Sequence, residues 1–395
     1  MGLASAIASR GMSQRIKLAE KAIKQGFFNE RALLKIAEKK GKIKYGGSHT
    51  EFEWYIRNVK AGQTATFGNP DGELSVLTFE EQQPANRVHL PYCYLMKTYG
   101  ISDRSIEANK NASDNKIYDI IAENLTLAQI FMYDALGPAL YNGTSSDTEQ
   151  PVGLLGACGS PIHTSAHAVV AALASYAGRT LTTNGFTGSA ISSSTTGLGI
   201  QRTATLAAAG TSWDDNQWAP VVGSVEDILT TGGSALTAWS TGGIQALSIM
   251  ADLMSLTRTV SGTGTQIKPD TALMAQGPFS ALKNLAILGQ YNVRGINLGR
   301  EDLVFANFPN FVVDTLTCIK DTDVPASADG TERVIVLDSN EFYVETTHTK
   351  SEGLIKTDFD PNIAIINGAV GTLKANLAYR VSSPTAVGCI VGCGD

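Results

Sequence analysis

The sequence predicts an α+β protein in which helices and strands come in separate runs. Residues 51–60 (EFEWYIRNVK) alternate apolar and polar side chains, the period of a half-buried strand. Residues 113–136 instead place apolar side chains at the three- and four-residue spacing of a long helix. After residue 301, runs rich in Val, Ile, Phe and Tyr alternate with Gly and Pro turns, which is typical of strands. A chain of 395 residues is long enough for two or three subdomains.

The composition is poor in charge and rich in glycine. Charged residues make up 17% of the chain, against about 25% in typical globular proteins, and there are 39 glycines. Because the cores of protein interfaces are depleted of charge, this composition favours a protein with extensive contacts to other subunits. An ordinary globular protein rich in Ala, Gly, Ser and Thr is the alternative.

Basic residues gather at the N-terminus. Residues 1–44 hold 11 Lys and Arg and three acids, a net charge of +8 in a chain of net charge −6. Such a basic arm on an acidic body suits nucleic acid or an acidic neighbouring surface, and a solvated helical face is the alternative. The arm residues that we expect to make these contacts are Arg10, Arg15, Lys17, Lys21, Lys24, Lys39 and Lys40.

The sequence carries no recognisable targeting signal. Residues 1–9 (MGLASAIAS) have no charged region, and the mildly apolar residues 166–178 are too few to span a bilayer. The five cysteines are odd in number and mostly scattered, and the two at 389 and 393 fall outside the common zinc-ribbon spacing. These patterns predict a protein of the cytoplasm with reduced thiols.

The first 100 residues predict a helical arm followed by a long ribbon. Residues 12–25 and 29–40 have short apolar stripes of helical period, and Asn29 and Gly41 are typical of a helix start and stop. Phe52, Trp54 and Ile56 lie on one side of the following strand. The ribbon that follows, residues 59–82, has little to bury, so we expect it to lie on another surface, which can belong to another chain.

The tip of this ribbon is the turn at residues 69–72, and residues 86–102 form its return. Pro in the second position presets the turn and Gly in the fourth accepts a positive φ. The turn consists of Asn69, Pro70, Asp71 and Gly72.

The strongest helical pattern runs from Ser113 to Leu136, about 36 Å at 1.5 Å per residue. Gly137 and Pro138 are expected to bend or end it. A helix of this length is either a spine for a large flat protein or the central helix of an α+β core. The residues expected on its buried face are Ile117, Ile120, Ile121, Ala128, Phe131 and Ala135.

The rest of the chain predicts short strands and two further helices. Residues 156–235 are rich in Gly, Ser, Thr and Ala, with little charge or Pro, which favours short strands and turns over a disordered linker. Residues 242–260 predict a helix whose apolar side consists of Ile244, Leu247, Met250 or Ala251, and Met254. Residues 268–288 predict a short strand followed by a helix.

The sequence predicts no catalytic, metal or cofactor site. It lacks a phosphate-binding GxxxxGK[ST] loop, a GxSxG elbow and an HExxH pair. His163 and His167 are spaced like zinc ligands on a helix, but no acids lie nearby and Pro161 precedes them. The GLGIQR stretch at 197–202 lacks the rest of a dinucleotide site. Residues 358–362 (DFDPN) offer two carboxylates to a cation, although a turn explains them more simply.

The order of these parts resembles the major capsid proteins of tailed phages, the Hong Kong 97-type shell fold. The shared parts are the basic arm, the polar ribbon, the spine helix closing on ALYNG and PVGLLG, an inserted segment, and final strands ending in YRVSSPTAVGCIVG. The likeness covers nearly the whole chain but depends on element order rather than on invariant residues.

The resemblance implies a division of the chain into the parts of that fold. It implies an arm at 1–48, an extended β-hairpin loop at 49–100, a peripheral domain with the spine helix at 101–155, an insertion or surface subdomain at 156–235, an axial domain at 236–340, and return strands of the peripheral domain at 341–395. In the family the loop overlaps a neighbouring subunit, so the four tip residues and Trp54, Phe67 and Phe79 on the loop strands are expected at contacts between subunits. Some members crosslink a loop lysine to a neighbour's asparagine, but the chain has only Lys60 near the loop base, and we do not expect that chemistry.

The resemblance also implies a function and partners. It implies a non-enzymatic subunit of an icosahedral phage head, forming pentamers and hexamers around double-stranded DNA and located in the virion after assembly in the host cytoplasm. Scaffolding, portal and decoration proteins are expected partners, with packaged DNA bound non-specifically and no membrane or cofactor. The alternatives are an encapsulin-like nanocompartment shell and, more remotely, a Gly/Ser/Thr-rich adhesin or hydrolase. Deleting residues 1–44 is expected to impair assembly more than folding.

Overall fold

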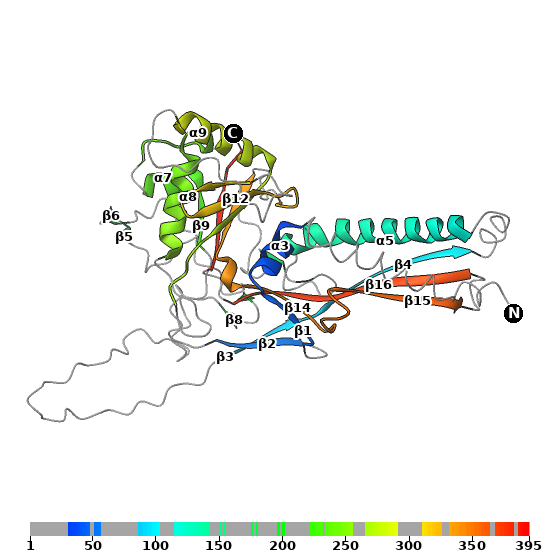
Figure 1. Cartoon of the computed structure of the whole chain (residues 1–395). Coiled ribbons are helices and arrows are strands. Elements are labelled where there is room, and N and C mark those ends of the chain that lie inside the picture. Colours follow the sequence, from blue (N-terminus) through cyan, green and yellow to red (C-terminus); the bar gives the residue numbers. More distant parts are fainter. Residues whose placement is uncertain are drawn as a thin grey trace, which may run out of the picture.

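The protein consists of two lobes built on two β-sheets, as the computed structural model in Figure 1 shows. The α+β class predicted from the sequence is therefore confirmed. None of the helices in the described ranges is both long and apolar enough to cross a membrane. The structure describes residues 31–47, 51–56, 86–102, 114–142, 151, 153–154, 175–176, 179–180, 196–197, 200–201, 221–231, 234–255, 265–290, 310–325, 332–363, 368–382 and 386–394.

The first lobe, here called the long lobe, contains the five-stranded sheet and two helices. Strand β16 lies at the centre of this sheet and pairs antiparallel with β14, β15 and β4, while β1 pairs parallel with β14. The elements are α3 (Ala32–Lys39), β1 (Ile43–Tyr45), β4 (Cys93–Ser102), α5 (Asp114–Asn142), β14 (Phe342–Thr346), β15 (Ile355–Ile363) and β16 (Gly368–Val381).

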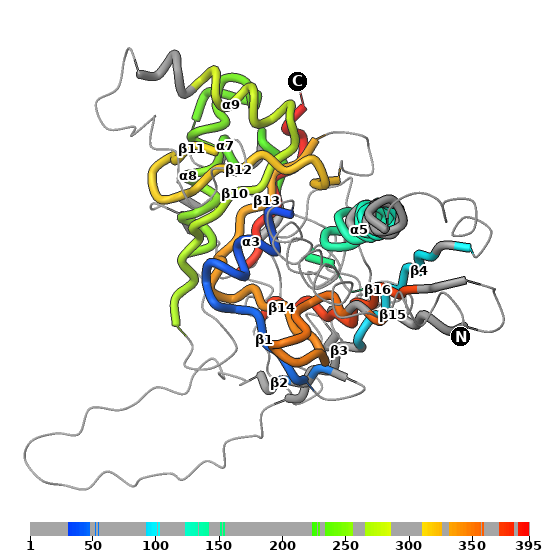
Figure 2. Tube along the Cα trace, turned by 45° about the vertical axis from the view of Figure 1, so that its right-hand side comes forward, coloured from blue at the N-terminus to red at the C-terminus, as the bar shows by residue number. Residues whose placement is uncertain are grey.

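Helix α5 runs along β4 and β16 as a separate layer, which Figure 2 shows almost end-on. Its 29 residues span about 43 Å. The helix continues through Pro138, where the sequence predicted a bend or an end. Ala139, Leu140 and Tyr141 in its last turn are buried, so their packing offsets the backbone hydrogen bond that the proline removes.

The buried face of α5 differs from the predicted one. Ala128 is buried as expected, but Phe131 is 54% exposed and Ala135 is also exposed. The side chains of the predicted isoleucines at 117, 120 and 121 lie outside the described residues. The residues that pack toward the core are Leu125, Ala128, Met132, Leu136, Ala139 and Leu140.

Helix α3 and strand β1, residues 32–45, are part of the long lobe rather than of a free arm. All five apolar residues of α3 are at most 1% exposed, and β1 adds a strand to the sheet. The helix ends at Lys39, followed by Gly41 with a φ of 64°, as the predicted stop at this glycine requires. The N-cap is Arg31 rather than Asn29, which lies outside the described residues, as does the predicted helix at 12–25. Deleting residues 1–44 would therefore remove core structure, contrary to the expectation that it would affect mainly assembly.

The second lobe, here called the compact lobe, contains a six-stranded mixed sheet in the order β11-β12-β10-β13-β17-β9, with helices α7, α8 and α9 packed around it. The predicted helix and strand–helix pair are confirmed as α8, β10 and α9. The elements are β9 (Val221–Ser224), α7 (Val225–Thr231), α8 (Trp239–Ser255), β10 (Thr271–Met274), α9 (Gln276–Gln290), β11 (Asn310–Val313), β12 (Leu316–Lys320), β13 (Arg333–Leu337) and β17 (Val387–Val391).

The core of the compact lobe lies between α8 and the sheet. Of the predicted stripe on α8, Leu247, Met250 and Met254 are fully buried, while Ile244 and Ala251 are partly buried. Trp239 at the start of α8 is also fully buried and donates its indole N–H to the carbonyl of Pro278 at 3.0 Å. One large side chain thus joins α8 to the first turn of α9.

The membership of the two sheets differs from the domain boundaries predicted from the sequence. Strand β17 lies between β13 and β9 in the compact lobe, although residues 341–395 were predicted as return strands of a single domain. Strand β9 and helix α7 belong to the same lobe, although they fall within the predicted 156–235 insertion. Short strands do occur in that insertion, as predicted, in the antiparallel pairs β5 (Ser175–Tyr176) with β6 (Arg179–Thr180) and β7 (Thr196–Gly197) with β8 (Ile200–Gln201).

The base of the predicted ribbon is an antiparallel pair of strands. Strand β2 (Glu51–Ile56) pairs with β3 (Asn86–Pro91), so the two ends of the predicted ribbon meet in register. Residues 57–85, which include the predicted tip, lie outside the described residues. The predicted turn at 358–362 is instead part of β15, where a register shift between Asp360 and Ile363 accommodates Pro361.

Candidate assembly surfaces

The ribbon base is attached to the long lobe through Arg380, on the sheet face opposite α3. The guanidinium carbon of Arg380, on β16, lies 5.3 Å from the ring centre of Phe52 and 5.0 Å from that of Trp54. On its own sheet it lies 4.6 Å from the ring of Tyr343. Because Phe52 and Trp54 are 9% and 5% exposed, these cation–π contacts are largely shielded from water and hold β2 on the sheet.

A buried carboxylate, Glu345, lies next to this aromatic cluster. It is 2% exposed and pairs with Lys44 at 3.2 Å. Burial raises the pKa of Glu345, and the charges of Lys44 and Arg380 oppose that rise. Lys42 donates a hydrogen bond to the hydroxyl of Tyr343 at 3.0 Å. Strand β1 and the residue before it thus bring two cations, Lys44 and Lys42, to the face of the sheet that receives the ribbon.

Three polar atoms buried at the ribbon base have no hydrogen-bond partner among the described residues. They are the indole nitrogen of Trp54, the hydroxyl of Tyr92 and the Nε of Arg380. Tyr92 lies between β3 and β4, and a Cβ added to Gly47 would lie 2.1 Å from its hydroxyl oxygen. Any other residue at position 47 would therefore displace the Tyr92 side chain from this part of the backbone.

Tyr92 is expected to ionise only at strongly alkaline pH. Burial and then the negative charge of Glu345 raise its pKa to about 12, above the usual 10.0. Because the pKa in the folded state exceeds that of the unfolded state, the stability that Tyr92 contributes is fully present below pH 10 and is lost as the pH rises toward 12. The difference in phenolate absorbance between wild type and Tyr92→Phe during an alkaline titration measures this. A difference spectrum that develops with a midpoint near 10 would contradict the expectation.

Helix α5 also carries large exposed apolar side chains outside the stripe that packs on the core. Leu127, Ile130 and Phe131 occupy adjacent positions of one helical surface and are 45%, 46% and 54% exposed. The ammonium of Lys97 on β4 lies 4.6 Å from the ring centre of Phe131. On the opposite face of β4, Tyr94 and Met96 are 55% and 50% exposed. The long lobe therefore presents apolar side chains on both of its broad faces.

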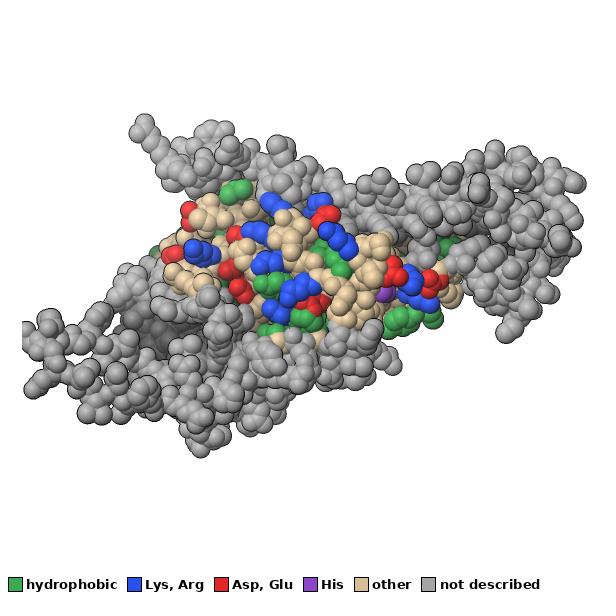
Figure 3. All heavy atoms as spheres, turned by 60° about the horizontal axis from the view of Figure 1, so that its bottom comes forward, with side chains coloured by type: hydrophobic (Ala, Val, Ile, Leu, Met, Phe, Trp, Pro, Cys, Tyr) green, Lys and Arg blue, Asp and Glu red, His purple; other side chains and the backbone are tan. Residues whose placement is uncertain are grey.

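Charges of both signs share the described part of the face shown in Figure 3. Lys and Arg side chains lie interspersed with Asp and Glu side chains, and small apolar patches lie between them. Opposite charges also pair on the sheet of the long lobe, where Asp358 lies 2.8 Å from Lys374 and 3.9 Å from Lys356. A mixed surface of this kind does not produce the large field of one sign that steers nucleic acid.

Comparison with known structures gives phage capsids and an encapsulin. The chain is similar to a capsid protein of cyanophage A-1(L), with a TM-score of 0.46 and 12% identity over 88% of this chain and 89% of that chain. It is similar to a protein of Mycobacterium phage Bobi, with a TM-score of 0.44 and 12% identity over 92% and 90% of the two chains. An encapsulin complex from Synechococcus elongatus gives a TM-score of 0.40 and 12% identity over 78% and 77%.

No family model matches the sequence, and no curated protein sequence matches it either.

The structure describes only some of the predicted contact residues. Trp54 lies in the ribbon base described above. Lys39 is in the last turn of α3, and Lys40 pairs with Asp270 of the compact lobe at 2.8 Å, so this lysine is engaged within the chain. The predicted contacts that lie outside the described residues are Asn69, Pro70, Asp71, Gly72, Phe67, Phe79, Arg10, Arg15, Lys17, Lys21 and Lys24.

The described residues include no grouping typical of metal binding. No three His, Cys, Asp or Glu side chains lie close enough there to hold a metal ion. His163 and His167 lie outside the described residues. The four described cysteines are free and buried, and burial raises the pKa of the Cys389 thiol to about 11.

Sequence reasoning missed Arg380, Tyr343 and Glu345, which receive the ribbon base. A signal for Arg380 was present, because Thr372, Lys374, Asn376 and Arg380 follow the period of two expected for one face of a strand. Nothing in the sequence marks the opposite strand β14 as its neighbour, since the pairing of β14 with β16 joins segments about 35 residues apart.

Proposed function

We propose that the protein is the structural subunit of an icosahedral phage head, in which copies assemble into pentamers and hexamers around double-stranded DNA. The observation that supports this most directly is the two-sided apolar character of α5. One side of the helix packs on the sheet through Leu125, Met132 and Leu136, while Leu127 and Ile130 on another side are exposed to solvent. A helix with apolar surface on several sides is normally covered on all of them, which favours coverage by another subunit.

The shape of the long lobe also supports a shell. At β4 and β15 the lobe is a single helical layer on a single sheet, as Figures 1 and 2 show, and Tyr94 and Met96 on the outer face of β4 are about half exposed. Thin lobes of this kind gain stability from contacts between subunits, and folding and assembly become difficult to separate. Closed shells provide such contacts by repeating one set of interfaces under symmetry.

The ribbon provides a further means of joining subunits. Its base is held on the long lobe by Arg380, Phe52 and Trp54. In the proposed shell, residues 57–85 continue from this base onto a neighbouring subunit, where the four tip residues, Phe67 and Phe79 make contacts. Trp54 contributes to these contacts by holding the base on its own subunit.

Within this proposal the two lobes have different places in the shell. The long lobe corresponds to the peripheral domain, and the compact lobe to the axial domain near the five-fold and six-fold centres. The basic residues before Arg31 bind packaged DNA or an acidic neighbouring surface. Scaffolding, portal and decoration proteins are the expected partners in the virion.

Electron microscopy of the full chain expressed alone, and with candidate scaffolding proteins, tests the proposal. We expect closed shells or rings of five and six subunits on negatively stained grids, together with early elution in size-exclusion chromatography. Shells that enclose protein cargo and exclude DNA in the producing cell would favour an encapsulin-like compartment instead. A compact monomer under all of these conditions would contradict the proposal.

A further inference from the structure

Among the described residues, the chain passes between the two lobes at two neighbouring connections, while the connection from α5 to β9 lies mostly outside them. The first is the 3-10 turn η5 (Ser339–Glu341) between β13 and β14, and the second joins β16 to β17. Hydrogen bonds tie the two together: the Ser382 N–H donates to the Glu341 carbonyl at 2.9 Å, and the Asp338 N–H donates to the Ala386 carbonyl at 2.9 Å. Because the connections run side by side, they form one joint, about which the lobes could turn if nothing else joined them.

A third segment, residues 31–45, bridges the lobes beside this joint and is here called the strap. Its strand β1 belongs to the long lobe through parallel pairing with β14, and the Val344 N–H donates to the carbonyl of Lys42 at 3.1 Å. Its helix α3 is buried along its apolar side, including Leu33, Leu34 and Ile36. Each end of α3 makes an ion pair with the compact lobe.

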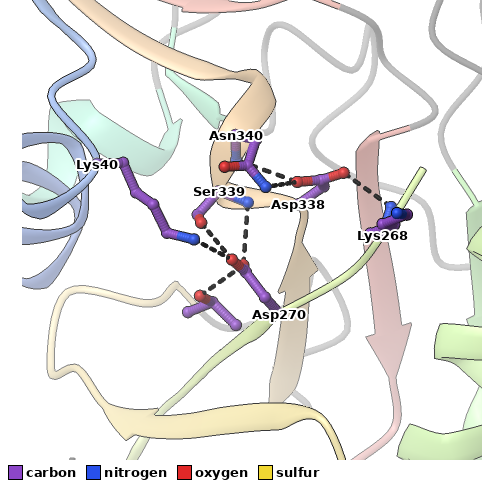
Figure 4. Close-up of polar contacts among 7 residues, drawn as sticks. Lys40, Lys268, Asp270, Asp338, Ser339 and Asn340 are labelled. Atoms are coloured by element: carbon purple, nitrogen blue, oxygen red, sulfur yellow. Dashed lines mark hydrogen bonds and ion pairs between the residues drawn. The ribbon is translucent and has the colours of Figure 1, made fainter. Parts of the chain in front are cut away.

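The ion pair at the C-terminal end of α3 reaches the joint directly, as Figure 4 shows. Lys40 donates to Asp270 at 2.8 Å, just before β10. The same carboxylate accepts from the N–H of Ser339 at 3.0 Å and from its hydroxyl at 2.5 Å, and therefore joins strap, compact lobe and η5. Asp338 stabilises the turn by accepting from the N–H groups of Asn340 at 3.0 Å and Lys268 at 2.8 Å.

The ion pair at the N-terminal end of α3 is more deeply buried. Arg31 pairs with Asp323, in the turn after β12, and the two side chains are 12% and 14% exposed. The neighbouring Asp321 accepts a hydrogen bond from the hydroxyl of Tyr141 on α5 at 2.6 Å. A Cβ added to Gly137 would lie 2.5 Å from an Asp323 oxygen, so glycine lets the backbone of α5 approach this pair. The turn of the compact lobe is thus held by both α3 and α5.

We propose that the strap fixes the angle between the two lobes through the Arg31–Asp323 and Lys40–Asp270 ion pairs. The joint restrains the distance between the lobes and the Tyr141–Asp321 hydrogen bond adds one attachment, and the two ion pairs of the strap add two more that oppose rotation about the joint. The ion pairs lie at opposite ends of an eight-residue helix, so they act about 12 Å apart. Loss of both ion pairs leaves α3 packed by its apolar side and the Tyr141–Asp321 hydrogen bond in place, but it widens the range of angles that the compact lobe can take.

Distance measurements between spin labels on the two lobes test this inference. The labels are attached at the exposed positions Glu123→Cys on α5 and Lys283→Cys on α9. Background labelling is limited because Cys158 is replaced by serine and the four other native cysteines are buried. Labelled full-length chain is diluted into unlabelled chain, so that distances within one subunit dominate whether or not shells form. We expect one narrow distance distribution for the wild type and a broader, shifted one for Arg31→Met/Lys40→Met.

Lys35→Met is the matched control. Lys35 also lies on α3 but pairs with Glu38 of the same helix at 2.8 Å, so its loss should leave the distribution unchanged. If the double variant does not fold, the distance distribution of Lys40→Met tests the inference. The Lys40 side chain is 33% exposed, so its loss should broaden the distribution without unfolding the chain. A distribution as narrow as that of the wild type in the folded double variant, or in Lys40→Met when only that variant folds, would overturn the inference.

Discussion

Ile130→Glu is expected to abolish shell assembly while leaving the subunit folded. Ile130 is 46% exposed on the outward side of α5, so a carboxylate there remains hydrated in the isolated subunit. In the proposed shell the same position is covered, and burying an unpaired charge costs about 2 kcal/mol or more at each contact. This weakens each contact by about 30-fold, and the effect is repeated at every copy of the interface in the shell.

Electron microscopy and size-exclusion chromatography measure the assembly of this variant, and circular dichroism measures its fold. Ile130→Leu is the control, because it keeps an apolar side chain of the same size and should assemble normally. Normal shells from Ile130→Glu would show that this side of α5 stays in contact with water in the assembly, and the main structural support for the proposed function would be lost.

Arg380→Met is expected to release the ribbon base and to lower the free energy of unfolding by about 2 kcal/mol. Methionine keeps much of the aliphatic volume but loses the cation–π contacts with Phe52, Trp54 and Tyr343, each of which contributes roughly 0.5–1 kcal/mol or more when shielded from water. It also removes one of the two cations that oppose the raised pKa of Glu345. Urea unfolding measures the stability, and hydrogen exchange measures the protection of β2 and β3.

Lys374→Met is the matched control for this change. Lys374 lies on the same strand and on the same face, but it pairs with the partly exposed Asp358 away from the ribbon. The loss of such a pair costs about 0–1 kcal/mol. Equal effects of the two substitutions on the exchange of β2 would mean that Arg380 does not hold the ribbon base.

Local patterns in the sequence predicted many of the elements. The alternation of Phe52 and Trp54 predicted a strand with one buried face, and both residues are buried. The stripe of Leu247, Met250 and Met254 predicted α8 and its buried side. These predictions succeed because each element has one apolar side, and that side packs on the body of the chain.

Helix α5 shows why the same reasoning failed elsewhere. Its sequence has apolar residues on more than one side, so periodicity could not decide between Ala128 with Phe131 and Ala128 with Met132 as the buried stripe. Packing of Leu140 and Tyr141 against the rest of the protein carries the helix past Pro138, which local propensity could not reveal.

Charge counting misled for the strap because ion pairs connect distant parts of the sequence. Lys40 contributed to the basic character of the first 44 residues, yet its partner Asp270 lies 230 positions away. Arg31 pairs with Asp323 across an even longer separation. The net charge of a segment does not show whether its charged side chains are paired or exposed. It therefore could not distinguish an exposed basic arm from a helix that is packed in the lobe and paired with distant acids.

The place of β17 in the compact lobe has a consequence for the timing of synthesis. Strand β17, residues 387–391, lies between β13 and β9 and pairs with both. Until the ribosome has translated these residues, β9 therefore cannot join the rest of the six-stranded sheet. Pairing between segments so distant in sequence is also slow, because a long loop must close before the contacts form. Until β17 is added, nascent chains therefore expose the unpaired edges of β13 and β9, and such edges can pair with another chain.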